Sequence, residues 1–312
     1  MAVAAPFTTQ KTMSTAAWGW LLLLGALWGI SFVFIKVAIA EIQPLTLVFL
    51  RTLLAALVLL SVCRVTGVRM PTSFQAWRDY AVLGFFSSSL AFSLIFWAQQ
   101  FIDASLSSIL IAATPFFTVL LAGALLKDER FTSQKILGVI IGFAGVTLVI
   151  GPRYLLGLGS NLTAELAVLL AAGAYAIASI WGRRFAGEAP LATATGQITT
   201  SAVMLLPMAL IFENPLHMDI PSWSVIGAVI ALAIFCTALT YLIFFRVLKM
   251  AGASNASLVG LVIPAFTMMF AVPLLGEEIT LLKIAGMLVV AIGMVVLDGR
   301  PLAALRDKLK AN

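Results

Sequence analysis

Ten long apolar runs, separated by short polar segments, constrain this 312-residue chain more than any other feature. A helix of roughly 20 apolar residues spans the hydrocarbon core of a bilayer, about 30 Å thick. The runs lie at about residues 18–39, 44–63, 80–98, 104–126, 134–151, 163–182, 191–212, 222–245, 254–275 and 280–297. The sequence therefore predicts an all-α polytopic membrane protein with ten transmembrane helices.

The composition leads to the same class of protein. Hydrophobic residues make up 62% of the chain and charged residues only 10%, whereas an average soluble domain is roughly 25% charged. So few charges cannot cover the surface of a soluble protein, which excludes a soluble enzyme and a disordered chain. The net charge of +6 comes from short basic runs between apolar segments, so we expect a lipid bilayer and no nucleic acid as partner.

Charges in the loops predict the orientation of the chain. Alternate loops hold most of the basic residues, and the positive-inside rule places those loops in the cytoplasm. The opposite loops and span ends hold Glu41, Asp103, Glu165, Glu213, Asp219, Glu277 and Glu278. We therefore expect a multi-pass protein of the inner (plasma) membrane, with its N- and C-termini in the cytoplasm.

The chain contains an internal repeat. Residues 87–129 align without a gap to residues 236–278, at an offset of 149, and the identical pairs include Ser105 with Ser254 and Glu129 with Glu278. Each copy holds five spans. Because five is odd, the second copy must cross the membrane in the opposite sense, a construction that many secondary transporters share. A duplicated membrane scaffold without a transport role is the alternative interpretation.

The repeat also divides the chain. We expect a cytoplasmic tail at 1–17, a first five-span repeat at 18–151, a connecting loop at 152–162, a second and inverted repeat at 163–297, and a basic cytoplasmic tail at 298–312.

Several motifs within these repeats resemble the EamA-type exporters of the drug/metabolite transporter superfamily. They are the run Ala26–Phe32 with Lys36, then Pro44 with Arg51, then Pro115 with Lys127–Arg130 and Gly138, and the copies Pro264, Glu277, Glu278 and Gly286. The resemblance covers about residues 18–297. It implies two inverted five-helix halves around a central cavity, lined mainly by spans 1, 3, 4, 6, 8 and 9, with spans 5 and 10 packed outside.

No cluster of residues predicts catalysis or metal binding. Cys63 and Cys236 give no disulfide framework, and His217 stands in a polar loop without other metal-ligand residues. No nucleophile–base pair or phosphate-binding loop is present either. We therefore expect no enzyme activity, no cofactor and no metal.

The acidic residues indicate how transport is driven. All of them fall in loops or near span ends, and Asp103 and Glu165 come closest to a span interior. Coupled carriers commonly have an ionisable group inside the membrane. The pattern favours facilitated diffusion, or coupling through a carboxylate at the rim.

Arg51 is the one deep charge, about two turns into the second span. A charge at that depth is usually paired or faces water. It could bind a substrate carboxylate. The favoured alternative is that Arg51 is a structural anchor, bonded to carbonyls, to Glu41 or to Asp103, because the family that this chain resembles has arginine here across varied substrates. Lys36, in the last turn of the first span, can extend its amine outward. These two cations are too few for phosphate.

Polar and aromatic residues at helical spacing are the candidates for a substrate path. Serine and threonine in membranes more often pack helices together, while Trp28, Tyr175 and Tyr241 are not explained by aromatic belts at the membrane surfaces. The candidates are Trp28, Ser31, Ser89, Ser93, Trp97, Gln100, Ser107, Thr114, Tyr175, Ser179, Gln197, Thr237, Tyr241 and Ser257. Pro115 and Pro264, at symmetric mid-span positions, are predicted hinges because proline removes a helical hydrogen bond.

Together these features predict a transporter that exports small amphipathic metabolites by alternating access. Amino acids, related compounds and lipophilic drugs fit a neutral cavity with aromatic walls. One rival is a proton-coupled or exchange carrier of another solute, phosphorylated solutes included. The second is a membrane enzyme or scaffold. Substrate, energy coupling and oligomeric state are left open by the sequence.

Overall fold

The computed structural model describes residues 14–126, 131–150, 161–251, 253–256 and 258–299, and within them the chain forms helices and no strands. In chain order the α-helices are α1 (Thr15–Ala38), α2 (Pro44–Thr66), α3 (Phe74–Gly84), α4 (Ala91–Ala98), α5 (Ala104–Ile111), α6 (Thr114–Leu125), α7 (Ser133–Ile150), α9 (Leu162–Gly182), α10 (Pro190–Phe212), α11 (Trp223–Ala233), α12 (Thr240–Ala251), α13 (Ala253–Ala256), α14 (Val259–Leu275) and α15 (Leu281–Asp298). Two π-helical segments, η1 (Phe85–Leu90) and η4 (Ile234–Leu239), and two 3₁₀ turns, η2 (Arg183–Phe185) and η3 (Pro215–His217), complete the described elements.

The predicted membrane crossings are confirmed. In the described part of the chain, nine helical stretches are long and apolar enough to cross a membrane, and the shorter apolar helix α14 provides a tenth crossing. Two boundaries needed correction. The third crossing begins at Phe74 rather than near residue 80, and the eighth continues to Ala251 rather than 245. Both extensions contain charged residues, which a search for apolar runs leaves out although the helix continues through them.

Local signals explain where the crossings begin and end. The Ser14 and Ser73 hydroxyls accept hydrogen bonds from backbone N–H groups at the starts of α1 and α3, as N-cap residues do. Pro44 stands in the first turn of α2, where its missing N–H costs nothing. Gly67 and Gly276 end α2 and α14 with positive φ angles of 71° and 69°, which glycine adopts without strain.

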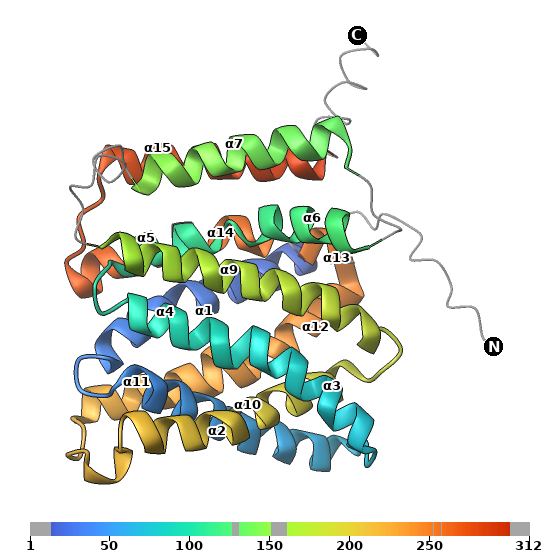
Figure 1. Cartoon of the computed structure of the whole chain (residues 1–312), viewed down its shortest axis with the longest axis vertical. Coiled ribbons are helices and arrows are strands. Elements are labelled where there is room, and N and C mark those ends of the chain that lie inside the picture. The colour runs from blue at the N-terminus through green and yellow to red at the C-terminus, as the bar shows by residue number, and fades with distance from the viewer. Residues whose placement is uncertain (1–13, 127–130, 151–160, 252, 257, 300–312) are drawn as a thin grey trace.

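The helices lie side by side in one bundle, with α7 and α15 paired along one edge (Figure 1). Glycines allow this pair to approach closely. A Cβ added at Gly293 would lie 2.6 Å from the backbone nitrogen of Gly142, and one added at Gly138 would lie 2.7 Å from that of Leu297. Spans 5 and 10 therefore form the outer layer that the resemblance implies, and their glycines serve helix packing.

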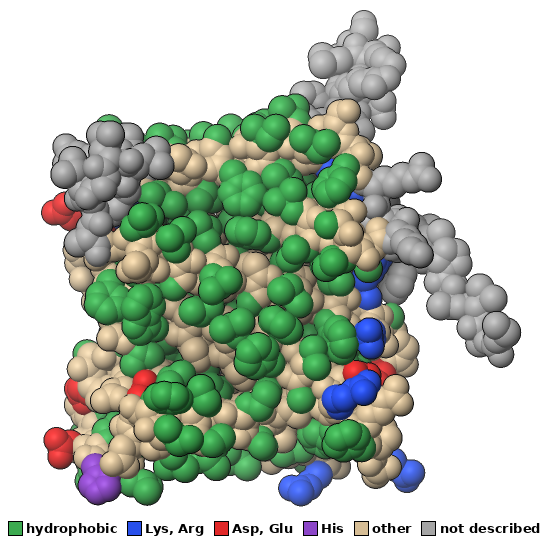
Figure 2. Space-filling model, in the orientation of Figure 1, with side chains coloured by type: hydrophobic (Ala, Val, Ile, Leu, Met, Phe, Trp, Pro, Cys, Tyr) green, Lys and Arg blue, Asp and Glu red, His purple; other side chains and the backbone are tan. Residues whose placement is uncertain are grey.

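The start of α1 and the end of α15 lie at the same side of the bundle (Figure 1), which we call the termini side. On the face drawn in Figure 2, basic side chains gather at that side, and most acidic side chains and the histidine lie at the other, which we call the opposite side. This polarity is the three-dimensional form of the charge bias in the loops.

The two halves, α1–α7 and α9–α15, share a backbone irregularity. The π-helical segments η1 and η4 interrupt the third and eighth crossings, and their residue numbers differ by 149, the offset of the sequence repeat. Segments of π-helix are rare and occur frequently at functional sites. Both halves therefore carry the same local distortion at equivalent positions of the repeat.

Candidate functional site

A cavity of about 380 Å³ lies between the two halves at mid-bundle. Of the candidates chosen from the sequence, those that line it are Trp28, Ser31, Arg51, Thr114, Pro115, Tyr175, Ser179, Thr237 and Tyr241. The other residues of the lining are Phe32, Ile35, Ser87, Phe92, Ile95, Phe96, Ile111, Ala112, Cys236, Thr240, Val259, Gly260 and Ile263. The lining is thus mostly apolar and aromatic, with hydroxyl groups and one charged side chain among the described residues.

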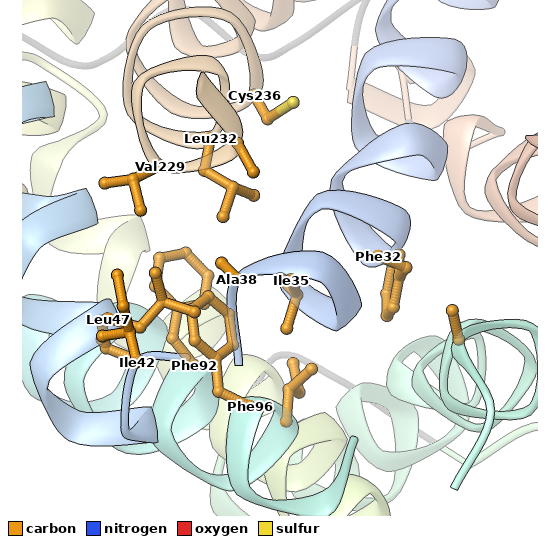
Figure 3. Close-up of a cluster of buried hydrophobic side chains, with 14 of the residues drawn as sticks. Phe32, Ile35, Ala38, Ile42, Leu47, Phe92, Phe96, Val229, Leu232 and Cys236 are labelled. Carbon is orange, nitrogen blue, oxygen red and sulfur yellow. The ribbon is translucent and has the colours of Figure 1, made fainter. Parts of the chain in front are cut away.

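Apolar side chains close the cavity toward the opposite side. Phe32 and Ile35 of α1 and Phe92 and Phe96 of α4 are all less than 10% exposed, and they belong to one large hydrophobic cluster. Figure 3 shows the Phe92 and Phe96 rings next to Ile42, with Ile35 on the neighbouring helix α1. In the other direction the lining extends to Ser179, which is exposed, near the termini-side end of α9.

Arg51 is buried, with 4% of its surface exposed. Its Nε donates a hydrogen bond of 2.8 Å to the Thr237 hydroxyl, and its Nη2 lies 3.4 Å from the Cys236 carbonyl oxygen. The guanidinium carbon lies 4.1 Å from the ring centroid of Phe92, a cation–π contact. Arg51 is therefore anchored partly to a carbonyl, as one of its sequence-based interpretations stated.

Neither carboxylate suggested as a partner of Arg51 fills that role. Glu41 accepts hydrogen bonds from Ser222, and Asp103 forms an ion pair with Lys283 at 2.5 Å. Within the described residues no ion pair to Arg51 is present. The interpretation of Arg51 as an anchor to Glu41 or Asp103 is therefore wrong, because both carboxylates are engaged at the opposite side.

The second half repeats this arrangement with neutral groups. Gln197 stands at the position in α10 that corresponds to Arg51 in α2, and its Nε2 donates a 2.5 Å hydrogen bond to the Tyr241 hydroxyl. Tyr241 corresponds in the repeat to Phe92, the ring that Arg51 contacts. The pairs Arg51–Phe92 and Gln197–Tyr241 are thus equivalent, and only the first is charged.

Two carboxylates of the second half bridge the halves at the opposite side, where they contact the starts of α5 and α2. Glu277, after α14, accepts hydrogen bonds from the backbone N–H of Ala104 at 2.6 Å, from that of Ser105 at 3.0 Å, and from the Ser105 hydroxyl. Glu213, after α10, accepts bonds from the Leu45 and Thr46 N–H groups at 2.9 and 2.6 Å. Each carboxylate therefore caps the positive N-terminal end of a helix from the other half.

Glu41 makes the third bridge. It follows α1 in the first half and accepts hydrogen bonds from the hydroxyl and backbone N–H of Ser222, the N-cap of α11 in the second half, at 2.7 and 2.6 Å. The hydrogen bond from the Ser222 hydroxyl, and less strongly the one from its backbone N–H, hold the pKa of Glu41 below its ordinary value of 4.5. We call Glu41, Glu213 and Glu277 the three latch carboxylates.

Lys36 does not line the cavity. Its Nζ donates to the carbonyl oxygens of Gln99 and Ile102, at 2.6 and 3.0 Å, where α4 ends. A cation near the C-terminal end of a helix is favoured by the helix dipole and by unpaired carbonyls there. Lys36 therefore ties the first crossing to the third at the opposite side.

The two prolines behave differently. At Pro115 the fourth crossing is broken into α5 and α6, and the Thr114 hydroxyl donates a 2.7 Å hydrogen bond to the Ile111 carbonyl, which Pro115 cannot bond. Pro264 stands inside α14. Because it has no N–H, the Gly260 carbonyl lacks its usual helical donor, and Gly260 lines the cavity.

The remaining candidates lie away from this lining. Trp97 is 39% exposed and packs against Phe101. Ser89 and Ser107 are buried, and their hydroxyls have no hydrogen-bond partner in the part of the chain that the structure describes. The candidates outside the lining are Ser89, Ser93, Trp97, Gln100, Ser107, Gln197, Lys36 and Pro264. Ser257 falls outside the described residues.

Sequence reasoning missed the residues that close the cavity and those that bridge the halves. Phe92 and Phe96 gave no polar signal, and the latch carboxylates looked like ordinary loop charges. The repeat held one clue, because Thr237, which bonds Arg51, pairs at the offset of 149 with Ser88 in the third crossing. Two small hydroxyl residues at equivalent positions could have marked both π-helical segments.

Comparison with known proteins follows the same two-part division. The sequence profile of the EamA-like transporter family matches residues 15–151 and again 162–297. An uncharacterized transporter of Archaeoglobus fulgidus is 27% identical over 281 residues, which cover 89% of this chain and 96% of that protein. A protein of Salmonella typhimurium, named a probable amino-acid metabolite efflux pump, is 27% identical over 282 residues, covering 88% and 91%.

A solved crystal structure shares the fold. It superposes with a TM-score of 0.65 and 18% sequence identity, and the match covers 93% of this chain and 98% of that one.

Proposed function

Because the chain belongs to the EamA-like transporter family, a branch of the drug/metabolite transporter superfamily, we propose that it exports small amphipathic metabolites by alternating access. Amino acids and related compounds are the favoured substrates, and lipophilic drugs are a further class. The relative named as an amino-acid metabolite efflux pump supports this choice.

The observation on which the proposal rests is the cavity between the two halves. Its volume of about 380 Å³ lies within the range of roughly 300–1,000 Å³ found for small-molecule sites. Its walls offer the faces of Trp28, Tyr175 and Tyr241 for an apolar body, and hydroxyl groups for a polar end. Such a lining suits a solute that is polar at one end and apolar at the other.

The contacts that close the cavity support alternating access. All three latch carboxylates join one half to the other, and all three lie at the opposite side. A rocking motion between the halves would break these bonds and open the cavity at that side. The described conformation thus represents the state closed toward the opposite side, and the inverted repeat provides a mirrored state.

The orientation is part of the proposal. We place the termini side in the cytoplasm and the protein in the inner membrane, because the basic side chains gather at that side (Figure 2). The repeats at 18–151 and 163–297 are then the two moving units, and the tails and the loop at 152–162 connect or flank them.

Glu165 favours a second candidate, a proton-coupled carrier. This side chain of α9 is 1% exposed, and neither carboxylate oxygen has a hydrogen-bond partner among the described residues. An unpaired charge is costly at such a site, so the group is suited to take up and release a proton. Replacing it, Glu165→Gln, should abolish accumulation driven by a pH gradient and leave counterflow intact if this candidate holds. Unchanged accumulation would exclude Glu165 as the proton carrier.

The proposal is tested with purified protein in proteoliposomes, by counterflow of radiolabelled amino acids, monocarboxylates and lipophilic cations. At least one of these classes should exchange faster than in empty liposomes. Trp28→Phe, Tyr175→Phe and Tyr241→Phe should then lower transport per folded molecule or change the preferred substrate, while the melting temperature stays close to that of the wild type. If all three lower only the melting temperature, these residues are packing groups.

A further inference from the structure

Arg51 is the one charged side chain in the described lining of the cavity, and most of its hydrogen-bonding capacity is unused. A guanidinium has five N–H donors. One donates to the Thr237 hydroxyl, and another faces the Cys236 carbonyl at the long distance of 3.4 Å. The remaining donors have no partner among the described residues.

The surroundings of Arg51 remove it from water without neutralising it. It is 4% exposed, and the Phe92 and Phe96 rings lie 4.1 and 5.6 Å from its guanidinium carbon. A buried cation is normally paired with an anion. Here Arg51 contacts a hydroxyl, a carbonyl and two aromatic faces, and an anion can reach the guanidinium from the cavity beside it.

The other half limits how much negative charge the cavity accepts. The equivalent of Arg51 is Gln197, which is neutral and already bonded to Tyr241. Lys36, the cation of the first crossing, is bonded to backbone carbonyls at the opposite side and does not line the cavity. One cation matches one negative charge. A phosphate dianion would want several cations around it.

The rest of the lining is suited to an apolar body. Trp28 and Phe32 of α1 and Ile263 of α14 line the cavity, as does Tyr175 of α9. Aromatic rings bind flat and apolar groups by stacking and by edge-to-face contacts. The two parts of the lining, one cation and an aromatic wall, therefore correspond to the two parts of an amphipathic anion.

We propose that the substrates are monocarboxylates with an apolar or aromatic body, amino acids included, and that the carboxylate binds the free N–H groups of Arg51. A carboxylate matches the planar fork of a guanidinium with two parallel hydrogen bonds, which lysine cannot reproduce. This inference rests on the proposed function and narrows its substrate class. Arg51 is then the residue that selects the charge of the substrate.

The test compares two probes of nearly the same shape, phenylacetate and phenylacetamide, for binding to the purified full-length protein by titration calorimetry. The wild type should bind the acid roughly ten- to hundredfold more tightly than the amide, the gain typical of a hydrogen bond to a charged group. Arg51→Gln should remove this preference. Arg51→Lys keeps the charge and should lose most of the preference, because it lacks the fork.

The matched control is Arg246→Gln. Arg246 is also a cation over an aromatic ring, 4.6 Å from the centroid of Trp20, but it does not line the cavity. This variant should keep the full preference for the acid. If Arg51→Gln does not fold, the wild-type comparison and Arg51→Lys still decide the question.

Equal affinity of the wild type for both probes would overturn the inference, as would a preference that survives in both Arg51 variants. Counterflow separates this failure from that of the proposed function. A protein that exchanges neutral or cationic solutes but shows no charge preference through Arg51 is still a transporter, whereas one that exchanges none of the tested classes is not the exporter proposed above.

Discussion

Replacing the latch carboxylate Glu277 by glutamine should open the opposite side of the cavity. Glu277 accepts three hydrogen bonds from Ala104 and Ser105, and all three cross between the halves. Glutamine keeps one acceptor oxygen but turns an NH₂ group toward at least one N–H donor. Losing a hydrogen bond to a charged group costs about 1.5–3 kcal/mol, and losing the charge at a helix N-terminus costs about 0.3–1 kcal/mol more.

These losses apply only to the closed state, because opening breaks the same bonds in the wild type. A shift of about 2–4 kcal/mol raises the population of the open state roughly 30- to 900-fold. The variant should therefore expose residues that the closed state buries, and Ile35, which is 2% exposed and lines the cavity, is a suitable reporter.

The assay measures how fast a cysteine at position 35 reacts with a membrane-impermeant maleimide. Cys63 and Cys236, both buried, are first replaced by alanine. The matched control is Glu278→Gln, since this neighbouring side chain is exposed and makes none of the cross-half bonds. Labelling should accelerate in Glu277→Gln and stay at the starting rate in Glu278→Gln. Equal rates in the two variants would refute the reasoning.

Two further predictions concern the latches and the outer helix pair. Since hydrogen bonds from Ser222 lower the pKa of Glu41, this latch stabilises the closed state above pH 4.5, and its contribution is lost as the pH falls through the lowered pKa. Ser222→Ala should therefore raise the pH at which acid speeds maleimide labelling to half of its full effect. An unchanged midpoint would show that Glu41 does not hold the cavity closed. Gly293→Ala should cost about 1–3 kcal/mol by overpacking against Gly142 and lower the melting temperature at unchanged transport per folded molecule, whereas Gly173→Ala, with no atom near its Cβ, should not.

The crossings could be predicted because the bilayer imposes them. Every backbone group inside the membrane must find a partner within the protein, so a long apolar run becomes a helix whatever its neighbours are. Short amphipathic ends were the exception. The first residues of α3, from Phe74, and the last residues of α12, up to Ala251, contain charged side chains. Capping and packing stabilise these helix ends, so hydropathy alone does not predict them.

The face of the third crossing could not be predicted, because η1 changes the helical phase. Regular α-helical spacing placed Ser89, Ser93 and Trp97 on the cavity face, but the residues that line it include Ser87 and Phe92, five positions apart. A π-helical segment turns the residues after it by the width of an extra residue. The paired hydroxyl residues Ser88 and Thr237 mark where the two segments lie, but they do not say by how much the face turns, so the structure is needed to correct it.

The latches and the state of Arg51 were out of reach for a related reason. A carboxylate that caps a helix of the other half has the same local sequence as one that faces solvent. The depth of Arg51 was evident from its position, and its partners were not, because they depend on how the second half packs against the first.

The central claim, that the two halves move against each other around the cavity, is tested most directly by joining them reversibly. Glu41→Cys and Ser222→Cys, in a variant lacking Cys63 and Cys236, place two thiols where side chains of opposite halves now touch. Oxidation to the disulfide should stop counterflow in proteoliposomes, and reduction should restore it. Full counterflow with the disulfide formed would contradict the account, because the opposite side would then open without separation of the halves.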